Sequence, residues 1–150
     1  MSFTHPQGTY GAGMPRGPLM RLTNTFAAWR ARRASGSTLG MNLLVLTAPG
    51  RTSGEPRSTP LAWFRDGDAW LVVASAGGDA SNPGWYRNVA AHPDDVTIEI
   101  GGETIPVTAT ELQGEDRAVA WERITKSAKQ FAGYERKTDR RIPVVRLTRR

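Results

Sequence analysis

Apolar residues follow two different spacings along the chain, and the spacing changes near residue 40. Within residues 18–34 they recur at steps of three and four; they are Leu19, Leu22, Phe26 and Trp29. This spacing predicts an N-terminal amphipathic helix over residues 18–35. Arg21, Arg30 and Arg32 lie off the apolar stripe, so the stripe either packs on the domain core or rests on an anionic membrane face.

Beyond residue 40 the pattern is that of short strands. Six segments are rich in apolar and β-branched residues: Asn42–Ala48, Thr59–Arg65, Ala69–Ser75, Val96–Ile100, Glu103–Leu112 and Ile142–Leu147. Asp66-Gly67-Asp68 and Gly101-Gly102 supply the positive φ angles that tight hairpins require, so neighbouring strands are expected to pair antiparallel. Helices are predicted over residues 83–91 and 114–129, the first with Asn82 as its N-cap.

Together these elements predict a mainly β (α+β) fold, a small, partly open barrel of antiparallel strands with helices inserted at a few junctions. Residues 1–17 are rich in Gly and Pro and lack periodicity, so they are predicted to form a flexible arm. Residues 18–150 are predicted to form a single domain that includes the N-terminal helix, because 150 residues suffice for one hydrophobic core.

Composition narrows the chemistry. The chain has no cysteine, which excludes thiolate catalysis, disulfides and Cys-type zinc sites, and its two histidines are isolated, so no metal site is expected. Residues 1–40 hold five arginines and no acidic residue, and therefore carry most of the net charge of +6. No apolar run is long enough to span a bilayer and no signal peptide is evident, so a cytoplasmic protein is expected. The N-terminal helix leaves open a peripheral contact with the inner face of the cell membrane.

The segment APGRTSGEPRSTP (residues 48–60) has the composition of an anion-binding loop. It combines two guanidinium groups, Arg51 and Arg57, with glycines whose N–H groups can face a ligand, and Ser53 and Thr59 add hydroxyl donors. The alternative is a solvated hairpin loop with ordinary surface charge. No P-loop or dinucleotide-binding glycine motif is present, so a nucleotide site of either kind has no support.

The segment ASAGGDASNPGWYRN (residues 74–88) offers a second binding surface. Gly77 and Gly78 leave the backbone uncovered, and a helix that begins near Pro83 presents free N–H groups to an anion. Trp85 and Tyr86 would either lie beside a flat ring of the ligand or pack in the core. Core packing is favoured for Trp85, because so short a helix must bury a large side chain.

Four segments in order give a more specific signal: GRTSGEPR (residues 50–57), ASAGG (74–78), NPGWYRN (82–88) and TDRRIPVV (138–145). Over about residues 40–148 the chain resembles the deazaflavin-dependent nitroreductase family of actinobacteria, whose members bind coenzyme F420 in a split β-barrel. The resemblance therefore implies a split barrel, F420 as the cofactor, and hydride transfer from the reduced deazaflavin to an electron-poor small molecule such as a quinone or an enone.

The resemblance also implies which residues bind the cofactor. Its charged end would meet Arg51, Thr52, Ser53, Arg57 and Ser58, its ribityl arm would meet Thr59, Pro60 and Leu61, and its ring would meet Ala74, Ser75, Ala76, Gly77, Trp85, Tyr86 and Asn88. Backbone donors of residues 74–77 would contact the ring edge. Ser75 and Tyr134 are the candidate catalytic residues, because either hydroxyl could polarise the acceptor.

Two departures from the family pattern affect the expected substrate. Ala76 stands where many members have lysine, and Phe131 and Ala128 stand where the nitroreductase that gives the family its name has aromatic hydroxyls. Activation of nitro drugs is therefore not the expected activity, and whether nitro compounds are reduced at all is left open.

Two rival functions stay open. The same fold can bind FMN, and a basic barrel can be an anion-binding module for lipid or nucleic acid. Nucleic acid is not the expected partner, because the predicted strands lack aromatic residues that alternate with Lys or Arg. The oligomeric state is left open.

Overall fold

Short antiparallel strands make up most of the protein in this computed structural model, which describes residues 3–12, 37–38 and 41–150. The strands are β1 (Ser37–Thr38), β2 (Met41–Pro49), β3 (Pro56–Ala62), β4 (Phe64–Asp66), β5 (Ala69–Val73), β6 (Val96–Ile100), β7 (Glu103–Glu111) and β8 (Val144–Arg149). The helices are η1 (Ala76–Gly78), α2 (Gly84–Ala91), α3 (Gly114–Ser127) and α4 (Lys129–Arg136). The helix predicted over residues 18–35 lies outside the described residues.

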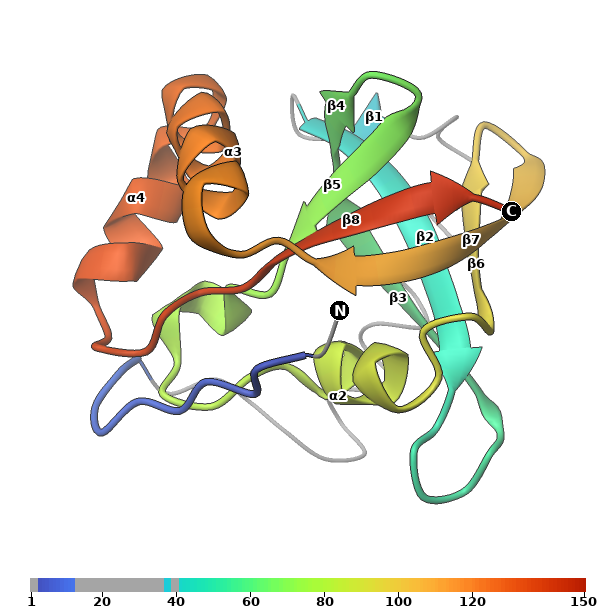
Figure 1. Cartoon of the computed structure of the whole chain (residues 1–150), viewed down its shortest axis with the longest axis horizontal. Helices are drawn as coiled ribbons and strands as arrows, with labels where there is room; N and C mark the ends of the chain where they lie inside the picture. The colour runs from blue at the N-terminus through green and yellow to red at the C-terminus, as the bar shows by residue number, and fades with distance from the viewer. Residues whose placement is uncertain (1–2, 13–36, 39–40) are drawn as a thin grey trace.

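The described strands form one sheet in the order β1-β2-β6-β7-β8-β5-β4. Strand β3 pairs with the edge of β2 opposite β6. Every pairing is antiparallel. The sheet curls on itself (Figure 1), and β3 approaches β5 without pairing to it in the described structure. This arrangement confirms the predicted antiparallel, partly open barrel.

The predicted hairpins are also confirmed. Gly67 has a φ of 61° between β4 and β5, and Gly101 and Gly102 have φ of 57° and 85° between β6 and β7. One boundary differs in a way that matters for function. β3 begins at Pro56 rather than Thr59, because the hairpin register continues to the pair Pro49 and Pro56, so the expected loop is reduced to residues 50–55.

Two clusters of buried side chains lie on opposite faces of the central strands. Val72 of β5 and Val145 of β8 face the barrel interior, whereas their neighbours Leu71 and Val144 face α3 and α4. Side chains alternate along a strand, so a run such as LVV is buried on both faces only when both faces are covered. Figure 1 shows α3 and α4 beside the sheet.

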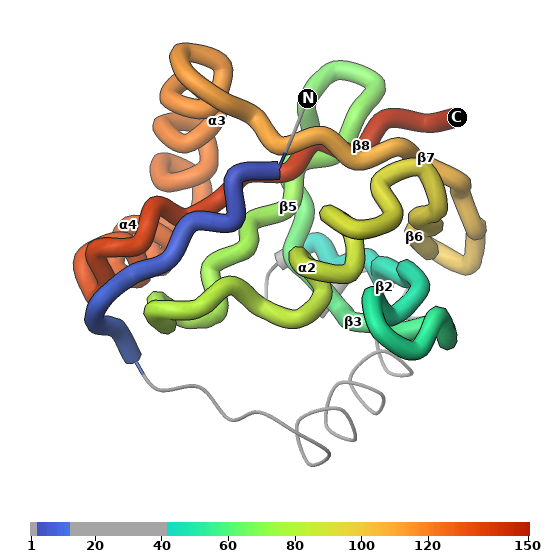
Figure 2. The backbone as a smooth tube through the Cα atoms, turned by 60° about the horizontal axis from the view of Figure 1, so that its bottom comes forward, coloured from blue at the N-terminus to red at the C-terminus, as the bar shows by residue number. Residues whose placement is uncertain are grey.

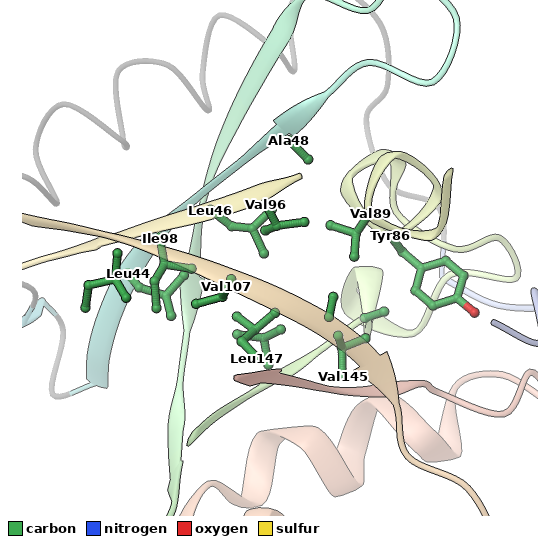
Figure 3. Close-up of a cluster of buried hydrophobic side chains, with 14 residues drawn as sticks. Leu44, Leu46, Ala48, Tyr86, Val89, Val96, Ile98, Val107, Val145 and Leu147 are labelled. Atoms are coloured by element: carbon green, nitrogen blue, oxygen red, sulfur yellow. The ribbon is translucent and has the colours of Figure 1, made fainter. Parts of the chain in front are cut away.

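Helix α2 closes one end of the barrel interior. Its Tyr86 and Val89, three residues apart and so on one helix face, are both fully buried among the strand residues (Figure 3). The helix begins one residue later than predicted, and Pro83 is its N-cap, without a side-chain cap bond. The predicted Asn82 cap was wrong, because the Asn82 side chain bonds elsewhere, as described below.

Residues 3–12, which belong to the predicted flexible arm, follow a defined path along the domain (Figure 2). The Gly8 N–H donates to the Ala80 carbonyl over 2.9 Å, and the Ala12 N–H donates to the Gly78 carbonyl over 3.0 Å. The Thr9 hydroxyl donates to the Asp139 carboxylate over 2.6 Å. Flexibility of the rest of residues 1–17 stays a prediction, since residues 1–2 and 13–17 lie outside the described chain.

Candidate active site

The loop between β2 and β3 is a closed hairpin loop of six residues, 50–55. The Gly50 N–H donates to the Glu55 carbonyl over 2.8 Å, and the Gly54 N–H donates to the Gly50 carbonyl over 2.8 Å. The Ser53 hydroxyl accepts from the Glu55 N–H over 3.2 Å. Because these bonds hold the backbone together, the exposed side chains of Arg51 and Thr52 point from a defined loop into solvent.

This loop is attached to helix α2. The Arg51 N–H donates to the Asn88 side-chain oxygen over 3.0 Å. The structure therefore brings together Arg51 and Asn88, which are 37 residues apart in the sequence. Figure 1 shows α2 between this loop and the turn that follows β5.

The predicted residues of β3 fall on two faces of the strand. Arg57, Thr59 and Leu61 lie opposite Ala48, Leu46 and Leu44 of β2, which face the barrel interior; Ser58 and Pro60 lie on the other face. The Ser58 hydroxyl shares a 2.8 Å hydrogen bond with the Thr47 hydroxyl on that face. A ligand inside the barrel mouth could meet the first three side chains, but it could meet Ser58 and Pro60 only through the strand backbone, whose edge away from β2 is unpaired in the described sheet.

The guanidinium group of Arg57 is available to an anion. Its described ionic contact is to Glu55 at 3.9 Å, and both side chains are substantially exposed, so the contact contributes little. The side chains of Arg51 and Arg57 thus project from the same hairpin, Arg51 from its loop and Arg57 from the start of β3.

Trp85 and Tyr86 occupy different environments. Trp85 is partly buried, with its ring 6.4 Å from that of Tyr86 in an edge-to-face arrangement. Tyr86 has no exposed surface. The core-packing interpretation favoured for Trp85 therefore applies fully to Tyr86, which can act on a ligand only by fixing α2.

The Tyr86 hydroxyl donates to the carboxylate of Glu111, itself only 4% exposed. It also accepts from the His5 N–H over 3.1 Å, while the Thr4 hydroxyl donates to the same carboxylate over 2.6 Å. Burial, followed by the hydrogen bond to Glu111, raises the pKa of Tyr86 to about 12. Figure 3 shows the phenol oxygen directed toward the N-terminal segment.

The turn after β5 has an unusual backbone. Ser75 is in the right-handed helical region, and the next three residues have positive φ: Ala76 at 48°, Gly77 at 64° and Gly78 at 89°. Successive N–H groups in a right-handed and then left-handed conformation converge to form an anion-binding nest. Across the described chain, the N–H groups of Ser75, Ala76 and Gly77 have no hydrogen-bond partner.

Ala74 differs from the other three predicted turn residues. It is fully buried and its N–H donates to the Pro143 carbonyl over 2.9 Å. The backbone donor expected at this position is therefore already used to join the turn to the segment before β8.

A residue that sequence reasoning missed holds this turn from behind. Arg140 is 2% exposed, and its guanidinium donates to the carbonyls of Ala74 (3.1 Å), Ser75 (2.7 Å) and Asp79 (2.9 Å) and to the Asn82 side-chain oxygen (2.6 Å). Both ends of the bond between Arg140 and Asn82 lie in segments that carry the family resemblance, Arg140 in TDRRIPVV and Asn82 in NPGWYRN. Nothing in the pattern of charges indicated that this arginine is buried.

Helix α4, which was not predicted because the expected helix ended at residue 129, packs against the turn. A Cβ added at Gly78 would lie 2.8 Å from the Tyr134 carbonyl oxygen and 2.9 Å from the Lys137 Cβ, so the turn and the helix touch. The Lys137 ammonium lies 5.7 Å from the centre of the half-buried Tyr134 ring. The two predicted catalytic residues, Ser75 and Tyr134, are therefore close to the same turn, and neither hydroxyl has a hydrogen-bond partner in the described structure.

The two ends of the site suit a long, anionic ligand with a flat head. Exposed guanidinium groups lie at one end, unused backbone donors and aromatic rings at the other, and α2, about 12 Å long, connects them. A deazaflavin with a charged tail fits this donor set, because a nest binds the electron-rich edge of a ring and guanidinium forks bind phosphate or carboxylate oxygens.

Known proteins of similar sequence are described by one activity. The family model described as F420H2-dependent quinone reductase matches residues 19–149. An F420H2-dependent quinone reductase of Mycobacterium tuberculosis is 44% identical over 110 residues, which cover 71% of this chain and 73% of that protein. The chain belongs to the F420H2-dependent quinone reductase family.

Solved structures show the same fold. An F420H2-dependent reductase called FDR-A superposes with a TM-score of 0.64 at 38% identity, covering 70% of this chain and 92% of that chain. A structure described as a domain-swapped dimer superposes with a TM-score of 0.65 at 34% identity, covering 84% of this chain and 98% of that chain.

Membership of this family confirms the predictions of a split barrel, of F420 as the cofactor and of an oxidoreductase. The family's description names quinone reduction, and a quinone was among the expected acceptors. None of the helices in the described part of the chain is long and apolar enough to cross a bilayer. The individual binding and catalytic residues stay predictions, taken up below.

Proposed function

We propose that this protein reduces a quinone with F420H2 bound along α2, between the loop of residues 50–55 and the turn of residues 74–78. The observation that carries the proposal is the nest at Ser75, Ala76 and Gly77, whose N–H groups are unused while the carbonyls of the turn are fixed. Its neighbour Tyr134 supplies the hydroxyl that the reaction needs.

The charged end of the cofactor would be held by Arg51 and Arg57. Thr52 and Ser53 lie between them on the exposed loop and add hydroxyl groups. A guanidinium bonded to a phosphate or carboxylate oxygen contributes about 1.5–3 kcal/mol. Because the loop is attached to α2 through Asn88, it is held in place before the ligand arrives.

The ribityl arm and the ring would follow from there. Thr59 and Leu61 face the barrel interior and would line the arm with their side chains, whereas Ser58 and Pro60 would contribute backbone only. The ring edge would accept hydrogen bonds from the N–H groups of Ser75, Ala76 and Gly77. The exposed part of Trp85 would form one wall, and Tyr86 would support that wall from the core.

The bound cofactor supplies a hydride. A quinone that takes up this hydride and one proton becomes a quinol, so the protein must deliver a proton to a carbonyl oxygen of the acceptor. The Tyr134 hydroxyl would donate that proton and recover one from solvent, while the Ser75 hydroxyl would hydrogen-bond the same oxygen as negative charge develops on it. Residues 3–12, which bond to Gly78 and Ala80, would keep this turn in place.

The experiment is a titration of the protein with F420, followed by the rate of F420H2 oxidation with a soluble quinone. Arg51→Gln and Arg57→Gln should each weaken F420 binding by roughly tenfold or more, since tenfold corresponds to about 1.4 kcal/mol. Arg65→Gln, at an exposed arginine of β4, is the matched control and should leave binding unchanged. Tyr134→Phe should lower kcat with little change in F420 affinity.

Two outcomes would sink the proposal. Absence of F420 binding at micromolar concentration would remove the cofactor assignment, and tighter binding of FMN than of F420 would favour the FMN alternative. Equal effects of all three arginine variants would mean that the loop attracts the cofactor only through general charge.

We further propose that residues 18–35 bring the protein to an anionic membrane surface, where lipid-soluble quinones are found. The support is in the sequence alone: an apolar stripe and five arginines without an acidic residue in residues 1–40. Vesicles of phosphatidylglycerol should sediment with the protein at low salt and vesicles of phosphatidylcholine should not. Equal partition to both would refute it.

A further inference from the structure

Arg140 is a buried cation whose hydrogen bonds all go to uncharged oxygens. Its guanidinium donates to three backbone carbonyls and one amide oxygen, and in the described structure it forms no ion pair. Burial lowers the pKa of Arg140 to about 10, so it keeps its charge at neutral pH. A buried charge without a counter-charge is costly, and such groups are seldom kept for stability alone.

The bonds of Arg140 select two particular peptide groups. Its Nη1 donates to the Ala74 carbonyl and its Nη2 to the Ser75 carbonyl. In a trans peptide the C=O and the next N–H point in opposite directions. The N–H groups of Ser75 and Ala76 belong to these two peptides, so they point away from the buried guanidinium, on the side where the ligand would bind.

These bonds also polarise the two donors. A carbonyl that accepts from a cation makes the N–H of its own peptide a stronger donor, an effect that is larger in a dry interior. The guanidinium also holds the turn at a strained residue, because Ala76 has a φ of 48°, in the left-handed region that L-residues rarely adopt.

We propose that Arg140 is a positioning residue that shapes and polarises the Ser75–Gly77 nest so that it binds the reduced ring of F420 more tightly than the oxidised ring. This rests on the proposed function. Reduction to F420H2 adds a hydride and a proton, so the net charge stays the same, but the two added electrons make the carbonyl-bearing edge of the ring more electron-rich, and polarised donors act most strongly there.

The charge-retaining variant Arg140→Lys isolates the fork, because one ammonium group cannot reach four oxygens in the directions that a guanidinium reaches. We expect it to raise the Kd for F420H2 by roughly tenfold or more and the Kd for oxidised F420 by less than about threefold. Arg117→Lys is the matched control. Arg117 is also partly buried and donates to a carbonyl, that of Ile142, over 2.6 Å, but does not touch the turn, so both Kd values should stay unchanged.

A second measurement covers the case in which Arg140→Lys does not fold. Amide NMR of the wild-type protein should show the Ser75 and Ala76 N–H signals moving downfield on F420 binding, and further with F420H2. The Ala74 N–H, already bonded to Pro143, should move little.

The outcomes separate the two claims. Binding of F420 with unmoved Ser75 and Ala76 amides, or a folded Arg140→Lys protein whose two Kd values change equally or not at all, overturns the role of Arg140 and leaves the proposed function standing. No binding of either form of F420 to the wild-type protein overturns the proposed function, and the role of Arg140 with it.

Discussion

The change Tyr86→Phe removes one hydroxyl from the interior and leaves the ring in place. Tyr86 is fully buried, its hydroxyl donates to the Glu111 carboxylate, and it accepts from the His5 N–H over 3.1 Å. In the variant the carboxylate keeps the two donors of Thr4 but loses its partner on α2.

The magnitude follows from the two bonds. A hydrogen bond to a charged group contributes about 1.5–3 kcal/mol and a neutral one about 1 kcal/mol. We therefore expect Tyr86→Phe to lower the free energy of unfolding by about 3 kcal/mol. For 150 residues this corresponds to a fall in Tm of roughly 10 °C.

The pH dependence gives a second, independent magnitude. Folding raises the pKa of Tyr86 from 10.0 to about 12, so the unfolded chain loses the phenol proton at lower pH than the folded chain. The contribution is complete below pH 10 and is lost as the pH rises through about 12. Two pKa units correspond to about 3 kcal/mol, so the stability difference between wild type and Tyr86→Phe should shrink toward zero over this interval.

The assay is urea denaturation of both proteins at neutral pH and at several values above pH 10. Tyr10→Phe is the control, because the Tyr10 side chain is 58% exposed and should contribute almost nothing. A Tyr86→Phe protein within about 0.5 kcal/mol of wild type, or a difference that stays constant with pH, would refute this reasoning.

Three further changes test the turn and the N-terminal segment. Ala76→Gly should raise the free energy of unfolding by about 0.5–1 kcal/mol in urea denaturation, because glycine adopts a φ of 48° without strain; a less stable variant would show that Ala76 is not strained. Gly78→Ala should lower the free energy of unfolding by at least about 2 kcal/mol, because the added Cβ meets α4. Gly67→Ala should lower it by only about 1 kcal/mol, because Gly67 also has a positive φ but has open space around it. Equal losses in the two variants would argue against the contact with α4. The hydrogen bonds from Thr9 lower the pKa of Asp139, so their contribution to folding stability is present above pH 3.8 and is lost as the pH falls through the lowered pKa. Hydrogen exchange of the Thr9 amide should therefore accelerate at that low pH in wild type, and at neutral pH in Asp139→Ala. A Thr9 amide that exchanges slowly in both cases would contradict the assignment.

The fold could be predicted largely from local signals. Hairpins were evident because Gly67, Gly101 and Gly102 lie where only positive φ closes the turn, and the strands between them alternate or form short apolar runs. The start of β3 could not be predicted, because Pro56 and Arg57 lack strand propensity and are held by the register with β2.

Motifs point to candidate site residues, but not to their faces or burial. Arg51 lies on a loop bonded to α2, and Ser75 and Tyr134 lie at the turn that follows β5, while their roles stay predictions. Whether Ser58 faces the same side as Thr59 depends on the strand register, and the burial of Tyr86 depends on which side of α2 faces the barrel. Arg140 was missed because its partners are backbone carbonyls, which leave no trace in a sequence.

The central claim is that reduced F420 binds with its ring at the turn of residues 74–78 and passes a hydride to a quinone. The most direct measurement is a single-turnover reaction of the F420H2-loaded protein with a soluble quinone, in wild type and in Tyr134→Phe. We predict that oxidised F420 and quinol form in equal amounts in both, and roughly tenfold more slowly or worse in the variant. Loss of F420H2 without quinol, or no oxidation by any quinone while F420 stays bound, would contradict the account.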